Sequence, residues 1–133
     1  MIVYSRLLVW ACGMTLAPRL IVIHPRYRND AGLLAHEHVH VEQMRRDGLL
    51  RFWWRYACSR RHRLAYEVEA YRVSIAHGST LAGCARTLAT GYWLGIDERQ
   101  AREALLAAPD PHAHSTGCGA GHAPATPMAR EPH

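Results

Sequence analysis

Two histidines four residues apart, with an acid beside the first, are the side chains of this sequence best suited to chemistry. They lie in LLAHEHVHVEQM, residues 33–44, where His36, Glu37 and His40 form the pattern H-E-x-x-H. Each residue of an α-helix advances about 100° around the axis, so His36 and His40 lie only about 40° apart. Both imidazoles can therefore reach one ion, as in zinc sites. Glu37 lies about 60° from His40, which suits accepting a proton from a water at the metal.

A catalytic zinc site needs a third protein ligand and one position left open. A third histidine six residues after His40 is excluded because residue 46 is Arg. The remaining candidates are Asp47, at the end of the same segment, and Glu67 and Glu69 in YEVEAYRVS. A second helix packed antiparallel on the first would deliver one of these carboxylates from a new direction. Glu67 is favoured because its face of that helix is apolar, where a carboxylate needs a charged partner.

Two more polar residues belong to the cluster. His38 falls about 160° from His40 and is expected to face solvent. Gln43 returns to the metal side of the helix, where it can hydrogen-bond in the site. The alternative is two ordinary histidines spaced by chance in a chain that contains 10 of them. Metal binding is favoured because a buried face rarely carries unpaired imidazoles.

The elements that must position these residues follow from local patterns. Residues 2–10 and 19–24 are rich in β-branched and large apolar residues, which predicts two short strands paired as a β-hairpin. Five helices are predicted, at about 30–47, 49–58, 64–78, 80–90 and 98–108, with 59–63 as a basic connector. Asn29 or Asp30 caps the first of them, and Ser79 or Thr80 caps the fourth, which runs to Thr90. The expected fold is α+β and mostly α: a short N-terminal hairpin, then about five helices, with the metal site between two of them.

Composition divides the chain into a domain and a tail. Its 133 residues, 49% of them hydrophobic, suit one small domain. Residues 109–133 are rich in Pro, Gly, Ala, His and Ser without an apolar period, so we expect a disordered tail after a domain at 1–108. The apolar run at 7–14 is too short to span a membrane, and Arg19 interrupts any extension of it. We therefore expect no integral membrane association and a cytoplasmic location, with secretion left open by that run.

Arginines form a second feature. All 16 basic residues are Arg, the net charge is +5, and seven of the arginines fall between Arg45 and Arg63. This cluster, interleaved with Trp53, Trp54 and Tyr56, could meet nucleic acid or an anionic surface. The more common alternative is a solvated helix face whose aromatic residues pack in the core.

Together, the two motifs resemble zincin metallopeptidases of the gluzincin branch, in which two His and one Glu bind zinc. The resemblance rests on HEHVHVEQ at 36–43 and YEVEAYR at 66–72. The second segment is similar to the E-x-x-A-D segment of CAAX-prenyl and heat-shock membrane proteases. The pairing of H-E-x-x-H-x-x-Q with E-x-E-A also resembles small phage- or prophage-associated zincin-like proteins, over about residues 19–76. The resemblance therefore implies a zincin-like metal site between two helices.

Carried over by position, the resemblance implies that His36 and His40 are zinc ligands and that Glu37 is the catalytic base. Glu67 becomes the third ligand, with Glu69 as the fallback. Tyr71 stands where the membrane proteases have an Asp that orients the ligands. The support of the histidines is therefore unidentified at this stage.

The expected function is zinc-dependent hydrolysis of a peptide bond in a peptide or protein substrate. Gln43, Glu69 and Tyr71 are candidates to support the ligands or the oxyanion, and Tyr92, His77 and Arg72 are further candidate donors. The strand at 19–24 could offer an edge to which an extended substrate adds. The alternative is a non-catalytic module stabilised by zinc, with nucleic acid as the second-choice partner, bound by its Arg-rich face.

Overall fold

The computed structural model describes residues 1–7 and 11–107. Its elements are β1 (Ile2–Tyr4), β2 (Gly13–Ala17), β3 (Leu20–Ile23), a 3-10 turn (Pro25–Tyr27), α1 (Ala31–Asp47), α2 (Leu49–Cys58), α3 (Arg60–Ala76), α4 (Leu81–Gly91) and α5 (Glu98–Leu106). The mostly helical α+β class is therefore confirmed. The predicted tail, and the last part of the predicted strand at 2–10, lie outside the described residues.

The sheet has the order β1-β3-β2, with β1 parallel to β3 and β2 antiparallel to it. The predicted hairpin between residues 2–10 and 19–24 is thus wrong in its partners, because those two segments pair in parallel. The antiparallel pair is β2 with β3, joined by a turn at Pro18 and Arg19. The predicted edge role of 19–24 is wrong as well, since β3 is paired on both sides.

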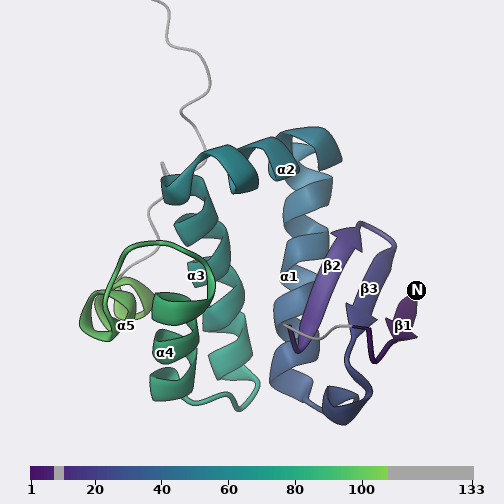
Figure 1. Ribbon diagram of the computed structural model, residues 1–133, viewed down its shortest axis with the longest axis horizontal. Helices are drawn as coiled ribbons and strands as arrows, with labels where there is room; N and C mark the ends of the chain where they lie inside the picture. Colours follow the sequence, from purple (N-terminus) through teal and green to yellow (C-terminus); the bar gives the residue numbers. More distant parts are fainter. Residues whose placement is uncertain (8–10, 108–133) are drawn as a thin grey trace, which may run out of the picture.

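The helices form layers beside this sheet. In Figure 1 the sheet lies on one side of α1, α3 lies on the other, and α4 and α5 lie beyond α3. Helix α2 bridges the adjacent ends of α1 and α3. Buried Ile21, Ile23 and Val41 join the sheet to α1. The pair α1 and α3 therefore forms the middle of the molecule, between the sheet and the last two helices.

Side-chain caps define where the helices begin. The Asp30 carboxylate accepts a hydrogen bond from the Leu33 amide at the start of α1, and the Thr80 hydroxyl caps α4. Asp97 and Gln100 form a reciprocal capping box on α5. The predicted connector at 59–63 is wrong, because Ser59 caps α3 and the arginines after it form that helix's first turn. No helix within the described ranges has both the length and the apolar character needed to cross a membrane.

Candidate metal centre

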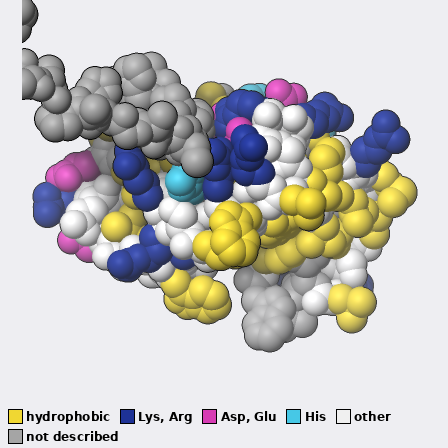
Figure 2. Space-filling model, turned by 90° about the horizontal axis from the view of Figure 1, so that it is seen from above, with side chains coloured by type: hydrophobic (Ala, Val, Ile, Leu, Met, Phe, Trp, Pro, Cys, Tyr) yellow, Lys and Arg dark blue, Asp and Glu magenta, His cyan; other side chains and the backbone are white. Residues whose placement is uncertain are grey.

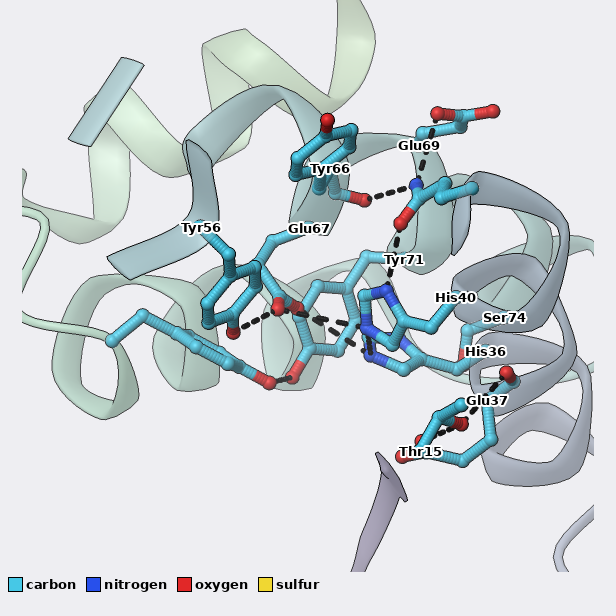
Figure 3. Close-up of polar contacts among 12 residues, drawn as sticks. Thr15, His36, Glu37, His40, Tyr56, Tyr66, Glu67, Glu69, Tyr71 and Ser74 are labelled. Carbon is cyan, nitrogen blue, oxygen red and sulfur yellow. Dashed lines mark hydrogen bonds and ion pairs between the residues drawn. The ribbon is translucent and has the colours of Figure 1, made fainter. Parts of the chain in front are cut away.

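Three buried side chains converge where α1 faces α3. His36 and His40 come from α1 and Glu67 comes from α3, with exposed fractions of 5%, 8% and 1%. The two Nε2 atoms lie 3.1 Å apart. Oε2 of Glu67 lies 3.4 Å from Nε2 of His36, and its Oε1 lies 3.6 Å from Nε2 of His40. Figure 3 shows the two rings and the carboxylate directed toward one another.

The spacing of these atoms fits one small cation. Ligand atoms held about 2.0–2.1 Å from an ion at tetrahedral angles lie about 3.3–3.4 Å from each other. The three observed distances, 3.1, 3.4 and 3.6 Å, bracket that value. In addition, Oε2 of Glu67 is buried and makes no hydrogen bond, a costly arrangement for a carboxylate unless a cation is nearby. This buried group could therefore hold a metal ion.

The charge on Glu67 is stabilised by its neighbours. Burial alone would raise the pKa of this carboxyl, but His36, His40 and a hydrogen bond from Tyr56 hold it below its ordinary value. The Tyr56 hydroxyl donates to Oε1 at 2.5 Å. Burial, followed by the charge of Glu67, raises the pKa of Tyr56 itself. Tyr56 therefore keeps its proton and holds the carboxylate in place.

Gln43 fixes the orientation of the His40 ring. Its Nε2 donates to the Tyr66 carbonyl at 3.0 Å and to Oε2 of Glu69 at 2.9 Å. Both partners are acceptors, so the amide oxygen is the atom that lies 2.8 Å from Nδ1 of His40. Nδ1 must then carry the proton, which leaves Nε2 of His40 with its lone pair directed at the cluster. Of the residues that the sequence offered as support for the ligands, Gln43 is thus the one that contacts His40.

The other carboxylate candidates lie outside the cluster. Glu69 is bound by Gln43 and by the Arg46 guanidinium at 3.0 Å. Asp47 accepts a 2.5 Å hydrogen bond from Tyr66 and lies 3.6 Å from Arg55. Burial and this hydrogen bond raise the pKa of Tyr66 to about 12. Glu69 and Asp47 therefore brace the two helices beside the site.

Tyr71 and Tyr92 close the side of the site next to α4. The Tyr71 ring packs edge-on against His36, with ring centroids 4.4 Å apart, and its hydroxyl lies 2.8 Å from that of Tyr92. Burial raises the pKa of both hydroxyls, so both keep their protons. Of the other donor candidates, Arg72 binds carbonyls at the end of α5, and His77 folds back on the Val73 carbonyl. Tyr71 and Tyr92 therefore remain as the candidate donors near the ligands.

Glu37 lies apart from the three ligand candidates, against β2. Its side chain is 3% exposed, and the Thr15 hydroxyl lies 2.8 Å from Oε2 and 3.0 Å from the Glu37 carbonyl. The neighbouring strand residue is Gly13, where an added Cβ would lie 2.9 Å from Oε1 of Glu37. His38, on the opposite face of α1, is exposed, as predicted. The strand therefore fixes where the acid lies relative to the metal cluster.

Two cavities of about 480 Å³ each meet at this site, and His36, Glu37 and Tyr92 line both. The half next to α2, here called the aromatic half, is also lined by Phe52, Trp53, Tyr56, Trp93 and Arg63. The half next to α4, here called the hydroxyl half, is also lined by Ser74, Ser79, Thr80 and Thr87. The cluster and the acid therefore lie in a cleft whose two halves differ in chemistry.

Tyr56 and Thr15 are the site residues that sequence reasoning did not identify. Tyr56 lies in an aromatic run that also suits core packing, and Thr15 lies in a strand that was not predicted.

Comparison of the chain with protein-family models, with curated proteins and with solved structures finds no match. What the site can do is therefore argued from its own geometry.

Proposed function

We propose that this protein is a zinc-dependent metallopeptidase. The observation that carries the proposal is the buried His36-His40-Glu67 group together with Glu37, an acid of the same cleft that is not needed as a ligand. Two imidazoles and one carboxylate form a ligand set typical of catalytic zinc, with one position left for water or substrate. A purely structural zinc site usually has four protein ligands, whereas three come together among the described residues.

A zinc ion in this site would supply Lewis-acid polarisation of a carbonyl and make a nearby water more acidic. Glu37 accepts the proton of that water and delivers it to the leaving amine. Thr15 holds one oxygen of the Glu37 carboxylate, which orients the acid for both transfers. The Tyr71 ring packs against His36, and its hydroxyl pairs with that of Tyr92. These two hydroxyls keep their protons, so they are the favoured donors to an oxyanion.

The edge of the sheet supports a peptide as the substrate. Gly13 and Thr15 of β2 line the cleft, and no strand among the described residues pairs with the outer side of β2. An extended peptide can add to such an edge through main-chain hydrogen bonds. We therefore assign to β2 the substrate role that the sequence had suggested for residues 19–24.

The test is Glu37→Gln, with Glu42→Gln as the matched control. Glu42 lies on the same helix but is exposed. We expect one zinc per chain in the wild type and in both variants, and hydrolysis of a peptide library reduced about 10²–10⁴-fold in Glu37→Gln alone. Zinc binding without hydrolysis in the wild type would favour the non-catalytic module instead. Iron as the bound metal would overturn the zinc assignment, since two His and one carboxylate also serve iron.

A further inference from the structure

The outer side of α2 is apolar although it faces away from the core. Phe52 and Tyr56 point inward, whereas Leu50 and Trp54 lie on the opposite side of the helix with exposed fractions of 86% and 71%. Leu49 is a further exposed leucine at the start of the same helix. Core packing thus accounts for only part of the aromatic run in α2. The outward stripe of Leu50 and Trp54 remains exposed.

This stripe continues onto the sheet. The indole N–H of Trp53 donates to the Leu16 carbonyl at 3.3 Å, which joins α2 to the end of β2. Leu16 and Met14 of that strand are 42% and 41% exposed. Figure 2, which looks down on α2 and the adjoining end of the sheet, shows hydrophobic side chains gathered there with Arg side chains around them. We call this the α2–sheet face.

Arginines are the charged residues of α2 and of the turn that follows β2. Helix α2 contributes Arg51 and Arg55, and the turn that joins β2 to β3, at the same end of the sheet as α2 in Figure 1, carries Arg19. Arg51 lies next to the apolar stripe on α2, and no ion pair within the described ranges involves it. The face therefore combines exposed apolar side chains with arginines, of which Arg51 makes no ion pair among the described residues.

We propose that the α2–sheet face docks on the surface of an anionic lipid bilayer. A helix that presents Leu and Trp between arginines inserts its apolar side chains at the level of the lipid headgroups. Each Arg near an anionic surface adds to the attraction, and Trp is favoured at the membrane–water boundary. The contact is peripheral and does not depend on zinc or on the proposed peptidase activity.

Two other partners fit this face less well. Nucleic acid would use the arginines, but Arg46, Arg55 and Arg63 bind Glu69, Asp47 and the Tyr56 carbonyl within the molecule. The exposed leucines would also add little to such binding, which relies on charge and aromatic stacking. A second copy meeting the same face by two-fold symmetry would bring arginines against arginines, without acids to neutralise them.

The experiment measures binding of the full chain to unilamellar vesicles by co-sedimentation. Vesicles of phosphatidylcholine alone are compared with vesicles containing about 30% phosphatidylserine, in about 0.1 M salt. We expect binding to the anionic vesicles at least about tenfold tighter than to the neutral ones. Leu50→Ser and Trp54→Ser should each weaken it by about tenfold, since each removes several buried carbons. Arg51→Glu should weaken binding to anionic vesicles only.

The matched control is Leu106→Ser. This residue is also highly exposed, at 66%, but lies on α5. The control should bind vesicles as the wild type does, and circular dichroism checks that every variant is folded. Equal losses in the variants and the control would overturn the proposal. So would binding of single-stranded DNA without vesicle binding, or a concentration-dependent dimer that Leu50→Ser abolishes in a protein that binds no vesicles.

Discussion

Helix α3 lies between two parts of the protein interior that differ in chemistry. Toward α1 it buries polar groups, and each depends on a specific partner: Glu67 on Tyr56 and the histidines, Gln43 on His40. Toward α4 and α5 it buries Val68 against Leu88 and other apolar side chains. We call these the polar interior and the apolar interior. An apolar interior needs only shape and volume, whereas a polar interior of this kind is stable only while its charges are balanced.

The first test of this difference removes the Glu67 carboxylate from the polar interior. Glu67→Ala should lose the bound zinc, from about one ion per chain to nearly none after dialysis. It should also lose the stabilisation that added zinc gives the wild type. Elemental analysis and thermal unfolding with and without zinc measure the two effects. Glu69→Ala is the control and should keep the ion. Loss of zinc in the Glu69 variant alone would show that the ligand set is wrong.

The apolar interior should respond in the opposite way. Leu88 is fully buried, so Leu88→Ala should lower the free energy of unfolding by about 2–5 kcal/mol through lost burial and a cavity. The zinc content should stay unchanged. Urea unfolding of the zinc-loaded protein gives the stability, and exposed Leu106→Ala should shift it by less than about 0.5 kcal/mol. A simultaneous loss of zinc would mean that the two interiors are not independent.

A sharper test changes only the support of one ligand. Gln43→Ala removes the acceptor for the Nδ1 proton of His40, so zinc affinity should fall about 10–100-fold. Competition with a chromogenic chelator measures this change. Glu42→Ala, on the exposed side of the same helix, should leave the affinity unchanged. An unchanged affinity in the Gln43 variant would show that the orientation of His40 is set by packing alone.

The smallest expected effect concerns the cap at the start of α5. Asp97→Ala removes the side-chain acceptor for the Gln100 amide in the capping box. Unfolding free energy should fall by about 1 kcal/mol, with no change in zinc affinity. Asp97→Asn, which keeps a capping oxygen, should recover most of the loss. A variant that bound zinc more weakly would place α5 in the support of the site.

Local features of both fold and site could be predicted from the sequence because they depend on neighbouring residues. The spacing of His36 and His40 is set by the helical repeat, and the caps at Asp30 and Asp97 act within one turn. Glu67 could be favoured because an acid on an apolar helix face needs a partner. The contact of Glu67 with Tyr56 could not be predicted, because only the packing of α2 against α3 brings the Tyr56 hydroxyl to the Glu67 carboxylate.

The sheet was harder to predict because strand pairing joins residues that are distant along the chain. The parallel pairing of β1 with β3 leaves no local signal in either strand. Gly13 lies inside β2, where the side chain of Glu37 comes close to its Cα, and a glycine within a strand gives little local sign of that strand. The arginines after Ser59 show no apolar period, so only the cap at Ser59 indicates that α3 begins before them.

That glycine has a consequence for how this protein can change over evolutionary time. A side chain at position 13 would have to move the end of the Glu37 side chain from the place where Thr15 now holds it. A lineage that relies on the acid of the cleft is therefore expected to keep glycine there more often than a lineage that has abandoned hydrolysis.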